Sequence, residues 1–325
     1  MKSQRDFEAS APSLCLVILT MDEERNIAAC LESLRGAAIK ILVVDSGSTD
    51  RTVEIAKAHG AQTVFHKFET HAKQWEWALA NLPISAEWVL GLDADQRVTP
   101  ELLEEISAFI NGPAAKDSQI AGAYIKRRQV FRGKSIRHGG YYPKYLLKLF
   151  RADSVSVDPT DLVDHHFRVD GLAVKLKHDI TEDNQNEADI SVWIAKHNKY
   201  ARLQAREDYT REIGLKTAAA KGRFFGSPDE RVLRLKYLWN RLPLFVRPFL
   251  YFTYRYFFRL GFLDGKQGFI FHFMQAFWYR LLVDINLDQL RKHRPSELVE
   301  TTTADASDGD IGNSRETTTA GVPVG

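Results

Sequence analysis

The first part of the chain alternates short apolar runs with stretches of helical periodicity. The apolar runs are LCLVILT, ILVVD, TVFHKF and EWVLGLDAD, and the helix-like stretches between them are RNIAACLESL, DRTVEIAKAHG and AKQWEWALANL. This alternation is typical of strands that run parallel in one sheet and are connected by helices. The sequence therefore predicts a mainly parallel α/β layer, which we place at about residues 12–112.

Helix start and stop residues support this layer. Ser48 or Thr49 is expected to cap the helix that follows the second apolar run. Thr99 and Pro100 are expected to begin another helix, which ends before Gly112.

Composition limits the class of protein. The chain has 325 residues, of which 44% are hydrophobic, and this is enough for a large core. Its 44 Lys and Arg against 42 Asp and Glu leave a formal charge of +2, which does not indicate binding to nucleic acid. Cys15 and Cys30 are too few for a disulfide framework or a zinc site, so a reducing environment is expected.

The next part of the chain has a β-like pattern. Its apolar segments are AGAYIKRRQVF, YLLKLF and LAVKLKH. They could extend the sheet and form the far wall of a cleft. We therefore predict one catalytic domain at 12–186, with a donor half at about 12–112 and an acceptor half at about 113–186.

The C-terminal third changes character. Residues 187–294 are expected to be helical, and within them 231–283 are rich in aromatic and basic residues. Charged residues interrupt every window that is long enough to span a membrane. The segment therefore either lies in a membrane interface, which its composition favours, or packs as a helical lid on the α/β layer. Residues 295–325 have too few apolar residues to bury a core and are predicted to be a disordered tail.

The N-terminus also bears on where the protein works. Its first apolar run, 14–20, is short and is followed by three acidic residues within four positions, which is unlike a signal peptide. We expect the first domain to lie in the cytosol, on the cytosolic face of the membrane.

Two of the predicted strands end in acids. Ligands of parallel α/β sheets bind at the carboxyl ends of the strands, where Asp45 and Asp93 lie. Asp45 could accept hydrogen bonds from a ligand's hydroxyl or imide groups, and Gly47 would let the ligand approach the backbone. The alternative is an ordinary connection from strand to helix, with solvated acids.

The acids Asp93 and Asp95 are two residues apart. In an extended backbone both carboxylates would point to one side and could share a magnesium or manganese ion. An acidic loop is the alternative for this motif alone. The two acid motifs together favour a ligand site more strongly than either motif does alone.

The sequence gives little support to other reactions at this site. The chain has no P-loop, dinucleotide-binding or nucleophile-elbow motif. A haloacid-dehalogenase-like phosphatase would use Asp93 as nucleophile and Asp95 as acid and base, but Arg97 stands where that chemistry requires Thr or Val. A non-catalytic, membrane-associated nucleotide-sugar-binding protein is a further alternative, which the intact acids disfavour.

Three segments resemble glycosyltransferase family 2 in order and spacing: ILTMDEERNIAACLESL, ILVVDSGSTDRTVEIAKAHGAQTV and WVLGLDADQRVTPELLEEI. Within that family, YLLKLF and KHNKYARLQA are most similar to the lipopolysaccharide core β-glucosyltransferase group. The resemblance implies a GT-A (Rossmann-like) fold and inverting transfer from a nucleotide-diphospho-sugar. UDP-glucose is the favoured donor, and a lipid-linked or lipopolysaccharide-type glycan is the expected acceptor.

Site residues follow from the resemblance by position. Thr20, Glu23 and Asp45 are implied to hold the nucleoside. Asp93 is implied to lie near the ribose or diphosphate. Asp95 is implied to bind Mn²⁺ or Mg²⁺, and Asp93 could share this ion.

Other donor contacts are expected from the neighbouring segments. Ser48 is a candidate in the loop after Asp45, and Lys73 could reach a phosphate or lie on a solvated helix face. The sequence departs from the family close to Lys73, because Trp75 and Glu76 lie where relatives often carry Lys or Arg and Asn.

The catalytic base is sought in LVDHHF, where the family usually has a His-Glu pair. We rank Asp164 first, then His165, then Asp161. The alternative for this segment is a surface loop, and a metal site at His165 and His166 is weaker because adjacent side chains diverge.

Overall fold

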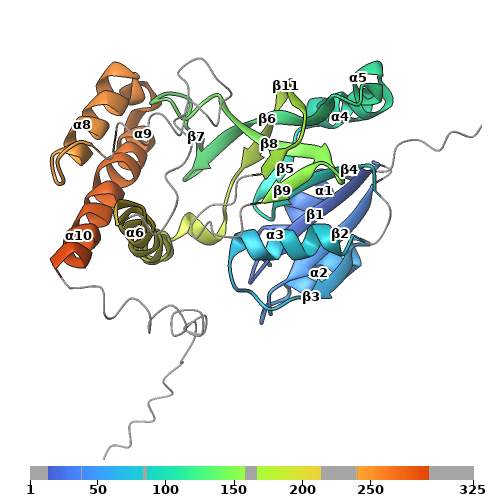
Figure 1. Ribbon diagram of the computed structural model, residues 1–325, viewed down its shortest axis with the longest axis horizontal. Helices are drawn as coiled ribbons and strands as arrows, with labels where there is room; N and C mark the ends of the chain where they lie inside the picture. The colour runs from blue at the N-terminus through green and yellow to red at the C-terminus, as the bar shows by residue number, and fades with distance from the viewer. Residues whose placement is uncertain are drawn as a thin grey trace, which may run out of the picture.

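The computed structural model describes residues 14–37, 39–82, 86–157, 167–213, 239 and 241–292. Within these ranges, a nine-stranded sheet forms the centre of one part of the molecule, and a group of helices from the C-terminal third lies beside it (Figure 1). The predicted tail, the base segment 158–166 and residues 214–238 lie outside the described residues.

One half of the sheet is parallel, as predicted. Its strands have the order β3-β2-β1-β4. They are β1 (Leu14–Thr20), β2 (Lys40–Asp45), β3 (Gln62–Phe65) and β4 (Trp88–Asp93). The helices that follow the first three strands are α1 (Ile27–Glu32), α2 (Thr52–Ala58) and α3 (His71–Ala80). The βαβα pattern of the sequence therefore corresponds to real parallel connections.

The other half makes the sheet mixed, so the prediction of a mainly parallel sheet is wrong for the whole. The order continues from β4 as β8-β6-β11-β5. These strands are β5 (Gln96–Val98), β6 (Ile120–Phe131), β8 (Lys144–Arg151) and β11 (Leu172–Glu182), with β7 (Lys134–Ser135) paired to β6. β8 is antiparallel to both of its neighbours, and it returns from β6 through the 132–143 connection, which contains β7 and no helix.

Smaller elements complete this part. α4 (Pro100–Asn111) begins as predicted, since the Thr99 hydroxyl accepts a hydrogen bond from Leu102 N at 3.3 Å. α5 (Pro113–Lys116) follows it directly. β9 (Val155–Val157) and β10 (Phe167–Val169) form a separate antiparallel pair on either side of the base segment.

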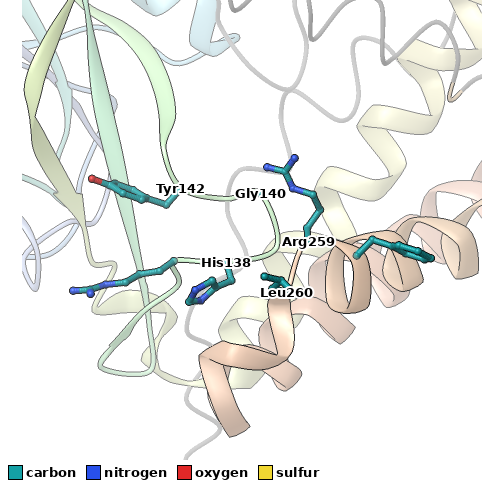
Figure 2. Close-up of a pocket in the computed structure, with 7 residues that line it drawn as sticks. His138, Gly140, Tyr142, Arg259 and Leu260 are labelled. Carbon is teal, nitrogen blue, oxygen red and sulfur yellow. The ribbon is translucent and has the colours of Figure 1, made fainter.

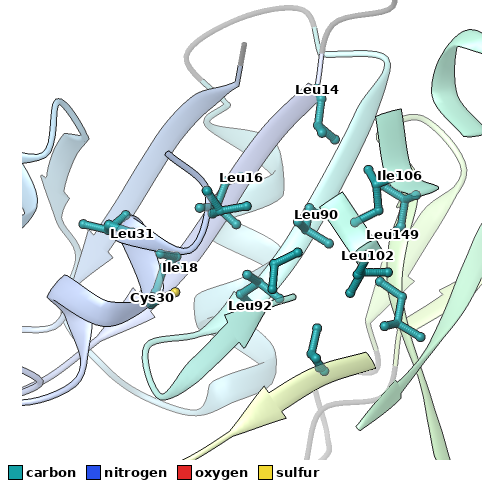
Figure 3. Packing of buried hydrophobic residues seen from close by; sticks show 14 of the residues in the cluster. Leu14, Leu16, Ile18, Cys30, Leu31, Leu90, Leu92, Leu102, Ile106 and Leu149 are labelled. Carbon is teal, nitrogen blue, oxygen red and sulfur yellow. The ribbon is translucent and has the colours of Figure 1, made fainter. Parts of the chain in front are cut away.

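The core lies on both faces of the sheet. On one face, Leu16, Ile18, Leu90 and Leu92 pack with residues of α1 and α4 (Figure 3). On the other face, Val17 and Val89 pack with Trp75 of α3 and Phe167 of β10. Because neighbouring residues of a strand point to opposite faces, a strand covered on both sides reads as a continuous apolar run.

The C-terminal helices form a second packed group. α6 (Ile190–Glu212) lies beside α10 (Tyr279–Lys292), with Ala201, Ala205 and Tyr209 packed on Val283 and its neighbours (Figure 1). The elements before α10 are α8 (Arg247–Thr253), η2 (Tyr254–Phe258), η3 (Gly261–Asp264), α9 (Gly265–His272) and η4 (Phe273–Trp278), and η1 (Asn186–Ala188) precedes α6. Among the described residues, no helix combines the length and the apolar character that crossing a membrane requires.

Candidate active site

The carboxylate that ends β2 is buried in its own loop. Asp45 is 5% exposed. It accepts hydrogen bonds from Thr20 Oγ1 at 3.0 Å, Gly47 N at 2.9 Å and Ser48 N at 2.8 Å. The Ser48 hydroxyl is a further donor to it. A carboxylate accepts about four hydrogen bonds, so Asp45 fixes the loop backbone and aligns the Thr20 and Ser48 hydroxyls.

The loops after β1 and β2 are joined by reciprocal contacts. Asp22 N donates to Ser48 Oγ at 2.9 Å, and Thr49 N donates to Asp22 Oδ1 at 2.8 Å. The prediction that Ser48 or Thr49 caps α2 is therefore wrong, because both are engaged with the neighbouring loop. The N-cap of α2 is Arg51, which makes no side-chain capping bond, and Asp50 Oδ1 accepts from the first helical N–H, that of Thr52, at 2.9 Å.

Glu23 lies at the same edge of the sheet. Its Oε2 accepts from Asn26 Nδ2 at 2.6 Å and from Asn186 Nδ2 at 3.2 Å. Burial raises the pKa of Glu23, and the hydrogen bond from Asn26 and the charge of Lys196 oppose this rise only in part. A cation or hydrogen-bond donor of a ligand would therefore be favoured here.

A buried lysine holds the acid at the end of β4. Asp93 Oδ2 accepts from Lys148 Nζ at 2.9 Å and from Gln96 Nε2 at 2.7 Å. Lys148 is 4% exposed and comes from β8, the antiparallel neighbour of β4. Gln96 Nε2 also donates to Glu182 Oε2 at 2.9 Å, so the end of β11 joins this cluster.

Asp95 reaches the cluster by a turn. It lies between β4 and β5, so the expectation of an extended backbone through Asp93 and Asp95 is wrong. The two carboxylates are nevertheless electrostatic neighbours. The pKa of Asp95 is raised well above its usual value, first by burial and then by the charges of Glu182, Asp93 and Glu23.

This donor set fits a hard divalent cation bound together with a ligand. No three His, Cys, Asp or Glu side chains of the described chain form a closed metal site. Magnesium, however, is commonly held by one or two carboxylates plus substrate phosphates. A cation beside Asp95 would relieve the crowding of negative charge that raises its pKa.

The other predicted residues lie in different settings. Lys73 is half-exposed and paired with Glu69, which lies four residues earlier, just before α3 begins. Trp75, where the sequence departs from the family, is a core residue packed edge-on against Phe167 at 4.9 Å. The base candidates Asp161, Asp164 and His165 fall within 158–166, outside the described residues. Their role remains a prediction.

Four residues of this site were not predicted: Lys148, Gln96, Glu182 and Lys196. Lys148 had a signal, because it is the one charged residue inside the apolar run YLLKLF. Glu182 follows an alternating strand and could have been examined as a third acid at a strand end. Gln96 lies in a polar stretch, and Lys196 is one of two Lys within 196–199, so neither had a comparable signal.

Comparison with known proteins identifies the family of this domain. A family model described as Glycosyl transferase family 2 matches residues 15–166. The chain carries a glycosyltransferase family 2 domain. The resemblance read from the three donor-site segments is therefore confirmed, and the domain includes β1, β2 and β4 with their acids.

Curated relatives bear glycosyltransferase names. An uncharacterized glycosyltransferase of Rickettsia typhi is 36% identical over 116 residues, which are 36% of this chain and 38% of that protein. The lipopolysaccharide core biosynthesis glycosyltransferase LpsC of Rhizobium meliloti is 26% identical over 204 residues, 59% of this chain and 70% of that protein. The chain thus spans well under half of the first relative.

Two solved structures with some likeness carry titles that name bound UDP. S. aureus TarS 1-349 in complex with UDP is 16% identical with a TM-score of 0.40, covering 87% of this chain and 92% of that chain. Glucosyl-3-phosphoglycerate synthase from Mycobacterium tuberculosis, with Mn²⁺ and UDP, is 24% identical with a TM-score of 0.29 and covers 37% of this chain and 44% of that one. These scores are too low to transfer site geometry.

Proposed function

We propose that the protein is an inverting glycosyltransferase that moves glucose from UDP-glucose to a hydroxyl of a lipid-linked or lipopolysaccharide-type glycan. One observation carries the proposal. Within the family 2 domain, Thr20, Asp45 and the Asp93–Asp95 pair come from adjacent strands and lie at one edge of the sheet. The choice of glucose and of a lipopolysaccharide-type acceptor is supported by the sequence resemblance and by the name of the LpsC relative.

The donor would bind across the loops after β1 and β2. Asp45 keeps the Thr20 and Ser48 hydroxyls and the Gly47 N–H in one arrangement, so this wall is formed before the ligand arrives. Glu23 would accept from the nucleoside at the rim of the same wall. Lys73 would need to leave Glu69 to reach a phosphate.

Asp95 would hold Mg²⁺ or Mn²⁺, with Asp93 beside it. When bound, such an ion neutralises charge on the diphosphate leaving group. The buried Lys148 fixes the Asp93 carboxylate through the 2.9 Å hydrogen bond from Nζ to Oδ2. Asp93 is thereby kept in place at the edge of the site.

The acceptor hydroxyl must lose its proton as it attacks the anomeric carbon. We propose Asp164 as the base, with His165 and then Asp161 as the alternatives. A base of this kind contributes about 10²–10⁴-fold to the rate. Glu182 is a third carboxylate to compare, although its oxygens are already engaged by Arg127 at 3.1 Å and by Gln96 at 2.9 Å. Full transfer rates in both Asp164→Asn and His165→Ala would exclude the first two candidates.

The protein would work at the cytosolic face of the membrane, attached through residues 231–283. Within the described part of this segment, large apolar side chains are exposed on α8, η2 and η3.

The phosphatase alternative loses its support, since the family 2 domain already accounts for Asp93 and Asp95. The intact Asp93 and Asp95 also argue against a purely non-catalytic binding protein.

The experiment measures sugar transfer to a lipopolysaccharide acceptor whose core is deeply truncated. The purified chain is given UDP-glucose, UDP-galactose or GDP-mannose with Mn²⁺, and the product linkage is assigned by NMR. A β-linked product from UDP-glucose supports the proposal. An α-linked product would refute inversion, and transfer from GDP-mannose alone would refute the donor.

A further inference from the structure

Two adjoining cavities lie where the sheet domain meets the C-terminal helices. One has a volume of about 370 Å³ and is lined mainly by the 137–142 loop and by Phe258, Arg259 and Leu260 (Figure 2). The other has about 250 Å³ and is lined by Arg128, Arg137 and Tyr142. Because Arg137 and Tyr142 line both, the two cavities form one depression.

This depression is positively charged. The segment 132–144 contains four Lys and Arg and no Asp or Glu. Arg128 is neutralised by Asp179, and His138 contacts Asp264 at 2.8 Å. The exposed guanidinium groups of Arg137 and Arg259, by contrast, make no hydrogen bond or ion pair with any residue that the structure describes. Two cationic groups are therefore left without compensation at the same cavity.

The backbone around these arginines is firmly held. Gly139 N donates to Arg259 O at 2.8 Å, and Arg255 Nη1 donates to Gly139 O at 2.6 Å. The buried Asp264 carboxylate accepts from Arg137 N at 3.2 Å and from His138 N at 2.9 Å. The loop from the sheet domain and the turn after η2 thus form one frame, which fixes the backbone from which the Arg137 and Arg259 side chains extend.

An apolar surface adjoins the cavity. Phe258, which lines it, is 74% exposed, and Leu260 is also exposed. Other exposed apolar residues of α8, η2 and η3 are Phe249, Leu250, Tyr254, Phe257, Phe262 and Leu263. An exposed apolar surface of this extent marks an interaction site. A basic depression bordered by aromatic side chains matches an anionic amphiphile better than a free anion.

We propose that this depression binds the phosphate group of an anionic membrane lipid, while Phe257, Phe258 and Leu260 enter the adjoining apolar layer. Arg137 and Arg259 would donate to the phosphate oxygens, for which the guanidinium fork is well suited. The site presupposes the membrane association proposed above and specifies its chemistry and residues.

The location also connects the membrane to the candidate active site. Tyr142 donates to Asp179 at 3.1 Å, and Asp179 lies on β11 three residues before Glu182. Three residues of a strand span about 10 Å. A lipid phosphate in the depression would therefore place the membrane surface close to the acid cluster.

Vesicle sedimentation of the full chain tests the site. The vesicles are phosphatidylcholine alone or phosphatidylcholine mixed two to one with phosphatidic acid. The double variant Arg137→Gln/Arg259→Gln is compared with Arg35→Gln/Lys57→Gln, which removes two exposed charges from the α1 and α2 side of the molecule (Figure 1). Phe258→Ser tests the apolar surface.

We expect the wild type and the Arg35/Lys57 variant to bind the mixed vesicles equally. The Arg137/Arg259 variant should bind them about 20- to 30-fold more weakly, at about 5-fold for each charge. Equal loss in both double variants would show a general charge effect and overturn the site. Unchanged binding of the Arg137/Arg259 variant would also overturn it, while leaving membrane association intact. A wild type that binds neither vesicle would refute the membrane association itself, and UDP binding would still test the transferase proposal separately.

Discussion

The imidazole of His272 occupies the space that a side chain on Gly139 would need. A Cβ at Gly139 would lie 1.9 Å from His272 Cε1, and one at Gly261 would lie 2.6 Å from His272 Nε2. The loop of the sheet domain and the first residue of η3 therefore both pack against one buried ring. This contact fixes the position of the C-terminal helices on the sheet domain.

Gly139→Ala should destabilise the protein by about 2–4 kcal/mol, because it combines an overpacked contact with a positive φ of 68°. Urea unfolding measures this. Gly133→Ala is the control, since Gly133 has a φ of 76° but no atom within 4 Å of the added Cβ. It should lose only about 1 kcal/mol. Equal losses in the two variants would mean that His272 does not fill this space.

The free energy of unfolding should decrease as the pH is lowered below about 6.5, because of His272. Burial, assisted by Arg255, lowers its pKa to about 4, while Asp264 opposes this. Between the ordinary value of 6.5 and about 4, the unfolded chain binds the proton and the folded protein does not. The free energy of unfolding should therefore decrease by about 2 kcal/mol from pH 6.5 to 5. His272→Leu should flatten this slope and His59→Gln should not; an unchanged slope in the Leu variant would assign it to other groups.

Asp284→Asn should destabilise the C-terminal helices strongly. Arg247 and Asp284 are 2% and 0% exposed as side chains, and Arg247 Nε donates to Asp284 Oδ1 at 2.7 Å. Loss of one charge leaves the other buried, which costs about 3–5 kcal/mol. Asp288→Asn, in the same helix but in a more exposed pair with Lys292, should cost about 0.5 kcal/mol or less. Similar midpoints of urea unfolding for both variants would contradict this.

Substitution of Lys148 and substitution of Asp93 should reduce the stability of the protein by different amounts. The Asp93 side chain is 42% exposed and that of Lys148 only 5%. Lys148→Met leaves a carboxylate that water can reach, so we expect a loss of about 1–2 kcal/mol. Asp93→Ala leaves a buried ammonium and should cost about 2–4 kcal/mol. The reverse order in thermal unfolding would mean that Lys148 is solvated in solution.

The sequence predicted the parallel half of the sheet because strands covered on both faces leave continuous apolar runs that polar loops interrupt. It did not predict β5 or the turn at Asp95, which the pairing of β5 with β11 determines. The cap of α2 was misassigned because Ser48 and Thr49 are bound to Asp22, a residue from another loop. Asp45 was predicted as a site residue from its position at a strand end, and this stays a prediction, whereas its hydrogen-bond partners follow from the contact between two strands.

Lys148 and Glu182 show the same limit for the site. Both reach the acids of β4 through strands from the second half of the domain, and only the antiparallel entry of β8 and the return of β11 bring them there. His272 and Gly139 are more than a hundred residues apart, and their complementarity has no local sequence pattern. Contacts between residues far apart in the sequence therefore determine both the charge environment of the β4 acids and the packing around His272.

The central claim is a metal-assisted nucleotide site at Asp95. Calorimetry of UDP binding with and without Mn²⁺ tests it most directly, on the wild type, on Asp95→Asn and on Asp153→Asn, which changes an exposed turn residue. We expect Mn²⁺-dependent UDP binding in the wild type and in Asp153→Asn, with about a 10-fold or greater loss in Asp95→Asn. Equal Mn²⁺-dependent binding in all three proteins, or no uridine-nucleotide binding in any, would contradict the claim.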